Sequence, residues 1–141
     1  MGPFGPGCAE MVWSTAADPS PRANNGAKAR HRPIDMAHLA KQTLGDKGLE
    51  LEVLRMFDET ARIYFGRIEL SASVEELLRH LHTLRGAALG IGAGAIASLA
   101  SAAESELREG APVNPERIHD LDMAVQECSA FIESLLARAE Q

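Results

Sequence analysis

From Ile34 onward, apolar residues recur at steps of three and four, which is the spacing of one face of an α-helix. A short segment over 36–43 shows the pattern first, and four longer segments follow it. Their apolar stripes are Leu54, Phe57, Ala61, Tyr64 and Ile68; Leu77, Leu78, Leu81 and Leu84; Ile96, Leu99, Ala103 and Leu107; and Ile118, Leu121, Val125, Cys128, Ile132 and Leu135. The sequence therefore predicts one short and four long amphipathic helices, and no strands.

The borders of these segments carry residues that begin or end helices. The N-cap candidates are Asp35, Asp46, Ser73 and Asn114. Glu76 stands three residues after Ser73, as in a capping box, and Pro115 takes the first position after Asn114. Gly45 and Gly110 follow two of the segments and can end them. Four long helices joined by short loops predict an all-α fold, an up-down four-helix bundle with the short additional N-terminal helix across one end.

Residues 1–32 differ in composition from the rest of the chain. They are rich in Gly, Pro, Ala, Ser and Asn and show no sustained apolar period. Such a composition is typical of a linker or tail. The sequence therefore predicts two parts, a flexible Gly/Pro-rich N-terminal tail over 1–32 and a helical bundle domain over 33–141.

The formal net charge of the 141 residues is −6, and it is unevenly distributed. Residues 1–33 hold four cationic side chains and two carboxylates, so the remaining residues carry −8. Nucleic-acid binding depends on Lys and Arg side chains that neutralise phosphates, so an acidic bundle argues against nucleic acid as a partner. Hydrophobic residues make up 45% of the chain and aromatic residues 4%, which allows one core built mainly from Leu, Ala and Ile.

The cysteines and histidines show no spacing typical of a metal site, and Cys8 and Cys128 are too few for a disulfide framework. We expect two free thiols in a reducing compartment. The N-terminus lacks the charged start and apolar block of a secretory signal. The uncharged run over 86–103 contains too few large apolar residues to insert into a membrane. We therefore expect a cytoplasmic protein that does not bind membranes or metals.

One histidine lies where a reactive surface group would be expected. At 100° per residue, His82 is about 115° from the centre of the stripe that contains Leu81 and Leu84, so it faces solvent or the rim of the bundle. Arg85 and Gly86 follow at three and four residues and share that surface. Arg85 can neutralise an oxyanion held on the imidazole, and Gly86 leaves room for another protein to approach the ring. Exposure, a nearby cation and clearance are what a nucleophilic histidine needs.

At these residues the chain resembles the histidine-containing phosphotransfer (HPt) domains. Their helix carries the pattern His-x-Leu-(Lys/Arg)-Gly, followed by small residues and a Leu/Ile-Gly-Ala turn. Here the pattern reads His82-Thr83-Leu84-Arg85-Gly86 and continues through Ala93. The resemblance extends to Glu104 and covers about residues 34–110, whereas the last helix matches only in its apolar pattern. Leu81 departs from the alanine of many members, and Arg85 replaces the commoner lysine.

The resemblance implies a phosphoryl carrier in a two-component phosphorelay rather than a self-contained enzyme. His82 would be phosphorylated on Nε2, Arg85 would orient the phosphate, and Gly86 would provide clearance. The partners would be the receiver domains of a hybrid histidine kinase and of a response regulator, between whose aspartates the phosphoryl group passes. The domain would have no cofactor of its own, because Mg²⁺ belongs to the acidic pocket of the receiver. A closed bundle has no obligatory need for a dimer, so we expect a monomer.

Leu78 and Leu89 flank His82 on the same face and could form an apolar margin for a receiver, or else pack against a neighbouring helix. His80 points nearly opposite to His82, so the two cannot chelate one metal, and we expect His80 at the border of the apolar stripe. The glycines at 90, 92 and 94 would end one helix and turn the chain into the next. Their GxGxG spacing, with no strand before it, does not fit a phosphate-binding loop.

Two other functions stay open. A histidine kinase dimerisation and phosphoacceptor fragment also uses a helical His, but its boxes read His-Glu-x-x-x-Pro, whereas Thr83 and Ala87 stand at those places and the chain has no room for an ATP-binding kinase domain. The chain could also be a structural or adaptor bundle that is never phosphorylated and in which His82 is inert. Phosphorylation by a receiver, with and without His82, separates the three functions.

Overall fold

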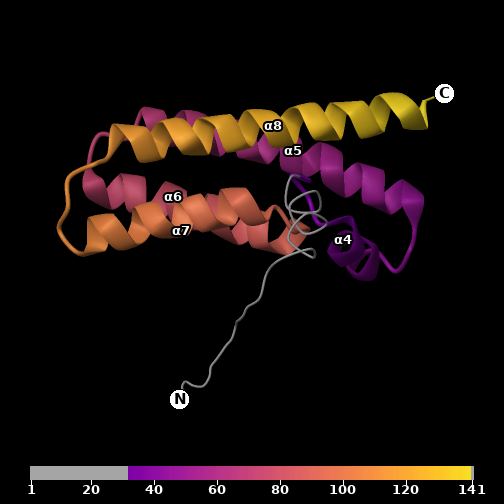
Figure 1. Cartoon of the computed structure of the whole chain (residues 1–141), viewed down its shortest axis with the longest axis horizontal. Helices are drawn as coiled ribbons and strands as arrows, with labels where there is room; N and C mark the ends of the chain where they lie inside the picture. Colours follow the sequence, from indigo (N-terminus) through magenta and orange to yellow (C-terminus); the bar gives the residue numbers. More distant parts are fainter. Residues whose placement is uncertain (1–31, 141) are drawn as a thin grey trace, which may run out of the picture. The chain divides into compact units, whose positions relative to one another are not determined.

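The computed structural model describes residues 32–140, and the predicted tail, apart from Arg32, lies outside this range. The described part folds into α4 (Met36–Gln42), α5 (Lys47–Glu69), α6 (Val74–Ile91), α7 (Gly94–Arg108) and α8 (Pro115–Ala139), with no strand among these residues. Helices α5 to α8 lie lengthwise beside one another, and α4 lies at the end where α5 begins and α8 finishes (Figure 1). The prediction of an all-α four-helix bundle with a short extra helix at one end is confirmed.

The four long helices form a closed ring. Helix α6 packs against both α5 and α7, and α8 packs against the same two helices from the other side. Each helix therefore contacts the helices before and after it in the chain, and α5 and α8 close the bundle, which is up-down topology. No helix within the described residues is both long and apolar enough to cross a bilayer.

Side chains cap the helices where the sequence predicts caps. The Ser73 hydroxyl accepts a hydrogen bond from the backbone N–H of Glu76 at 3.1 Å, and the Glu76 carboxylate in turn accepts one from the N–H of Ala72 at 2.7 Å. The side chains of Asp35, Asp46 and Asn114 each accept one hydrogen bond from a backbone N–H in the first turn of α4, α5 and α8. Each such cap contributes about 1 kcal/mol to helix stability, so local sequence determines where these helices begin.

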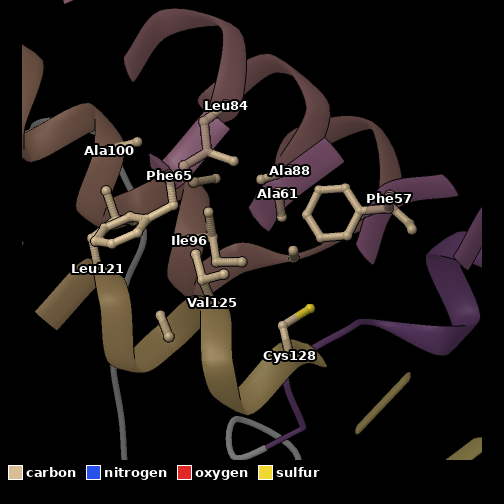
Figure 2. Packing of buried hydrophobic residues seen from close by; sticks show 14 of the residues in the cluster. Phe57, Ala61, Phe65, Leu84, Ala88, Ile96, Ala100, Leu121, Val125 and Cys128 are labelled. Carbon is tan, nitrogen blue, oxygen red and sulfur yellow. The ribbon is translucent and has the colours of Figure 1, made fainter. Parts of the chain in front are cut away.

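The inward faces of the helices form one apolar core. Phe57, Ala61 and Phe65 of α5 meet Leu84 and Ala88 of α6 across it (Figure 2). Side chains from α7 and α8 fill the remainder, among them Ile96, Ala100, Leu121, Val125 and Cys128. Leu81 and Leu84 are completely buried, so α6 is anchored on one face while its opposite face stays free to carry the site.

The turn between α6 and α7 depends on one glycine rather than on three. Gly92 has φ +87° and caps the C-terminus of α6, a conformation that favours glycine. Gly90 lies in the last turn of α6 and Gly94 is the first residue of α7, so both lie within helices. The expectation that all three form the turn is therefore wrong for the outer two, because the single left-handed residue at 92 is enough to separate the helices.

Candidate functional site

His82 lies on the outer face of α6. Its side chain is 61% exposed, whereas Leu81 before it and Leu84 after it are completely buried. This contrast follows from helix geometry, since residues one or two positions apart are rotated by about 100° or 200° around the helix axis and so project to different sides. The exposed position of His82 agrees with the orientation predicted from the apolar stripe.

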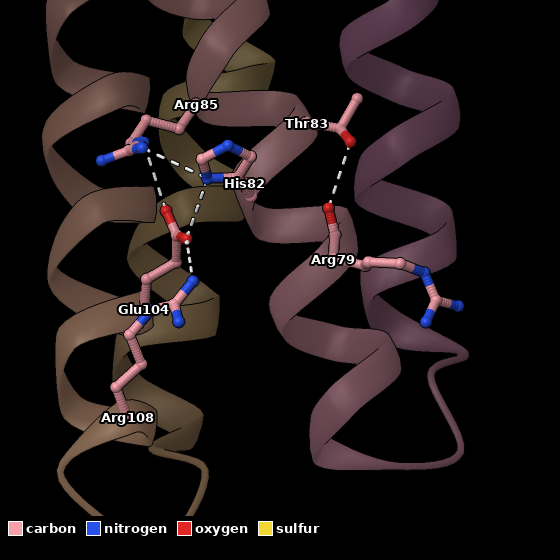
Figure 3. A network of polar contacts seen from close by, with 6 residues as sticks. All are labelled: Arg79, His82, Thr83, Arg85, Glu104 and Arg108. Carbon is pink, nitrogen blue, oxygen red and sulfur yellow. Dashed lines mark hydrogen bonds and ion pairs between the residues drawn. The ribbon is translucent and has the colours of Figure 1, made fainter.

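Glu104 of α7 meets the His82 ring from the neighbouring helix. Its carboxylate oxygen Oε2 lies 3.2 Å from Nδ1 of His82, and its side chain is only 6% exposed (Figure 3). Glu104 stands on the inward face of α7 among the buried Ala100, Ala103 and Leu107. Sequence reasoning assigned it no role. The available signal was one carboxylate within a stripe of buried apolar residues, since a buried charge needs a partner.

Two arginines approach the same carboxylate. Nε of Arg85 lies 3.2 Å from Oε1 of Glu104, and Nη2 of Arg108 lies 3.3 Å from Oε2. The Arg85 contact is an ion pair without hydrogen-bond alignment, since neither Arg85 Nε nor Glu104 Oε1 has an aligned hydrogen-bond partner. Nη2 of Arg85 also lies 3.2 Å from Nδ1 of His82. These contacts compensate the burial of one negative charge at the rim of the bundle.

The neighbours of His82 favour one tautomer. If Nδ1 carries the proton, it donates to the buried Glu104 carboxylate; if it does not, it accepts a hydrogen bond from Arg85. We assign the proton to Nδ1, because Glu104 is buried and depends on nearby donors, whereas the 34% exposed Arg85 has five N–H groups and keeps its ion pair in either case. This tautomer leaves a lone pair on Nε2, which has no hydrogen-bond partner within residues 32–140.

Gly86 opens the surface beside the ring. It is exposed in the middle of α6, and a Cβ atom added there would meet nothing within 4 Å. The absence of a side chain is therefore not required by packing inside the bundle. The site combines an exposed imidazole with an available Nε2, two adjacent arginines and a bare stretch of helix.

Comparison with known proteins assigns the chain to a family. The Hpt domain family model matches residues 52–140, from α5 to the end of α8. This chain belongs to the Hpt domain family. Hpt domains carry out histidine phosphotransfer in two-component systems and interact with receiver domains. The match includes α8, which the sequence resemblance covered only through its apolar pattern.

A solved structure shows the same fold. The crystal structure of the HPT domain from an Hpt sensor hybrid histidine kinase of Shewanella superposes with a TM-score of 0.66. The likeness covers 77% of this chain and 97% of that domain at 19% sequence identity. No curated protein sequence matches the chain.

The two leucines predicted to flank the site differ in this Hpt domain. Leu78 is half-buried and packs against the core, whereas Leu89 is 59% exposed. Of the two, Leu89 is therefore the one that leaves apolar surface exposed on the outside of α6. His80 is half-buried between α5 and α6, with its ring centroid 6.0 Å from that of Tyr64, which confirms its expected border position.

Proposed function

We propose that this Hpt domain is a phosphoryl carrier in which Nε2 of His82 accepts the phosphoryl group from a receiver aspartate and passes it to an aspartate of a second receiver. The observation that supports this best is the orientation of the His82 ring. Glu104 lies 3.2 Å from Nδ1, so the other nitrogen of a 61% exposed ring is left towards solvent. A receiver of a hybrid histidine kinase and one of a response regulator are the proposed partners.

The transfer needs no separate base, because the attacking nitrogen carries no proton. The Nε2 lone pair attacks phosphorus, the bond from phosphorus to the aspartyl oxygen breaks, and the electron pair leaves with the receiver carboxylate. The proton on Nδ1 stays in place, so the product ring is cationic, and Glu104 at 3.2 Å balances that charge. Mg²⁺ held by the receiver would neutralise phosphoryl charge during in-line transfer, and the Hpt domain supplies no cofactor.

Arg85 and Gly86 have supporting roles in this proposal. Arg85 follows His82 by three residues on α6, and its guanidinium already reaches within 3.2 Å of the ring. It would orient the phosphoryl oxygens after turning from Nδ1 towards Nε2. Gly86 would let the receiver come close, because nothing projects from its position, and Leu89 would contribute apolar surface to the docked complex.

The test is transfer from receiver domains of hybrid kinases that are phosphorylated with radiolabelled acetyl phosphate and Mg²⁺. We expect one labelled site, with a bond that is labile in acid and stable in alkali, as for a phosphoramidate. His82→Gln should abolish labelling while helix content stays intact, because the exposed ring fills no core cavity. His80→Gln is the matched control and should still accept phosphate.

The alternatives lead to different results. Label that persists in folded His82→Gln, or is lost in folded His80→Gln, would assign the acceptor to another residue. No label on the wild-type protein from any receiver tested would favour the adaptor function, in which His82 is inert. Labelling of His82 by a kinase ATP-binding domain, but not by receivers, would favour the histidine kinase fragment.

A further inference from the structure

We propose that Arg108 is a positioning residue of this site, which holds Glu104 on Nδ1 of His82 while Arg85 turns to the phosphoryl group. The proposal rests on the proposed function of His82 as phosphoryl acceptor. Arg108 makes no hydrogen bond to the ring itself and stands 26 positions after His82 in the chain.

The two carboxylate oxygens of Glu104 have different numbers of partners. Oε1 faces Arg85 alone at 3.2 Å, whereas Oε2 lies between His82 Nδ1 at 3.2 Å and Arg108 Nη2 at 3.3 Å (Figure 3). Arg85 can therefore leave without disturbing the oxygen that the imidazole uses. The oxygen that accepts from Nδ1 would then still be held by Arg108.

The two arginines are anchored to different helices. Arg108 follows Glu104 by four residues on α7, which is the favourable order for an ion pair along one helix. Arg85 is on α6 with His82, three residues after it. Movement of Arg85 towards a ligand on His82 breaks a contact between helices, whereas the contact of Arg108 with Glu104 is local to α7 and can persist.

The charges favour such an exchange. Before transfer, Arg85 and Arg108 face the single carboxylate of Glu104 and a neutral imidazole, so the site holds one positive charge in excess. Transfer adds a phosphoryl group of about two negative charges and makes the ring cationic, which brings the site close to neutral. The new negative charge lies at Nε2 and attracts Arg85. Glu104 then loses its contact with Arg85, and Arg108 is the arginine that still holds its carboxylate beside the ring.

The tautomer of His82 provides a readout that needs no phosphorylation. In protein labelled with ¹⁵N, the nitrogen shifts of the neutral ring in alkaline buffer give the ratio of the Nδ1–H and Nε2–H forms. Arg85→Ala imitates the state in which Arg85 has left Glu104. In that background, adding Arg108→Ala should raise the Nε2–H share about two- to fivefold, the range for an exposed ion pair, because a carboxylate that no arginine holds can turn away from Nδ1. In the wild-type background the effect should be smaller, because Arg85 still holds Glu104, and Arg85→Ala with Arg108→Lys should restore the Nδ1–H form.

Arg79→Ala is the matched control. Arg79 is an exposed arginine on α6, three residues before His82, and its side chain points away from Glu104 (Figure 3). Its loss removes the same charge and should leave the tautomer ratio unchanged in both backgrounds. Transfer from a phosphorylated receiver should slow about two- to fivefold in Arg108→Ala and stay closer to wild type in Arg79→Ala.

Each result separates this proposal from the proposed function. In the Arg85→Ala background, two results of Arg108→Ala count against the proposal: an unchanged tautomer ratio of His82, or a shift no larger than that of Arg79→Ala. Either result would overturn the positioning role of Arg108, even if His82 is labelled. A tautomer shift in a protein that no receiver labels would support the positioning of the ring and overturn the phosphoryl carrier. Slower transfer without a tautomer shift would also contradict the proposal, since it would assign Arg108 to receiver docking.

Discussion

The backbone N–H of Asp35 donates a hydrogen bond to the carbonyl oxygen of Gly92 at 2.9 Å, which ties the cap of α4 to the turn between α6 and α7. Nε2 of His38 donates to the carbonyl oxygen of Gly90 at 3.2 Å and adds a second link. A Cβ atom at position 92 would lie 3.2 Å from both Asp35 and His38. The close approach of α4 and the positive φ of Gly92 thus depend on the same missing side chain.

Gly92→Ala should therefore destabilise the bundle by about 1–3 kcal/mol, because alanine is strained at positive φ and crowds α4. Gly94→Ala is the matched control, since its added Cβ would meet nothing within 4 Å and it lies at the start of α7. We expect its stability to equal or slightly exceed that of the wild type. Urea unfolding followed by circular dichroism measures both, and equal stabilities of the two variants would show that the turn tolerates a side chain.

Gly86 should be required for transfer but not for a stable fold. Gly86→Ala should raise stability by up to about 1 kcal/mol, the usual difference between glycine and alanine inside a helix. Gly86→Glu should stay folded but slow receiver-dependent phosphorylation by at least about tenfold, since its side chain fills the approach to His82 and repels the phosphoryl group.

Gly66 of α5 provides the control for that experiment. A Cβ atom there also meets nothing within 4 Å, and position 66 belongs to a different helix from His82. Gly66→Glu should leave the transfer rate within about twofold of the wild type. If Gly86→Glu and Gly66→Glu transfer at the same rate, the receiver does not need the space left by the missing side chain at position 86.

The two leucines beside the site should respond differently to truncation. Leu89→Ala should raise the KM for the phosphorylated receiver with little change in unfolding free energy, because this side chain is 59% exposed. Leu78→Ala should lower the unfolding free energy, since Leu78 packs against the core, though by less than the roughly 2–5 kcal/mol of a fully buried leucine. A loss of stability in Leu89→Ala without a change in KM would show that Leu89 supports the fold and not receiver docking.

Cys128 should be an unreactive thiol. Burial raises the pKa of Cys128 to about 12, and the nearby negative charge of Asp58 adds to the effect. In a Cys8→Ser background at pH 8, alkylation of the folded protein should be roughly a thousandfold slower than in urea, because three pKa units separate the thiolate fractions. Rapid alkylation of the folded protein would show that α8 opens locally.

The raised pKa of Cys128 also makes the unfolding free energy depend on pH in the alkaline range. Below the pKa of the unfolded thiol, both states keep the proton and Cys128 introduces no pH dependence. As pH rises from about 9 towards 12, the unfolded chain ionises first, so this group lowers the unfolding free energy. Cys128→Ala should lose that part of the alkaline decline, which unfolding measured at pH 8 and pH 10.5 would reveal. An equal decline in both proteins would contradict the burial of the thiol.

The local sequence determined where the helices lie and which face of α6 carries the site. Caps such as Ser73 act on the backbone N–H groups of the next turn, and the apolar stripe through Leu81 and Leu84 orients its own helix. Both are interactions within a few residues, so they can be recognised along the chain. The exposure of His82 and the border position of His80 follow from the same geometry.

Only the tertiary structure decided what the site residues touch. Glu104 is 22 positions from His82, and their contact depends on the rotation and register of α7 against α6. The same packing turns Arg85 towards Glu104 rather than solvent, and it covers Leu78 while leaving Leu89 exposed. A helical period gives the direction of a side chain relative to its own axis. The position of the neighbouring helix comes from how the whole core packs, because side chains from all four helices must fill one volume.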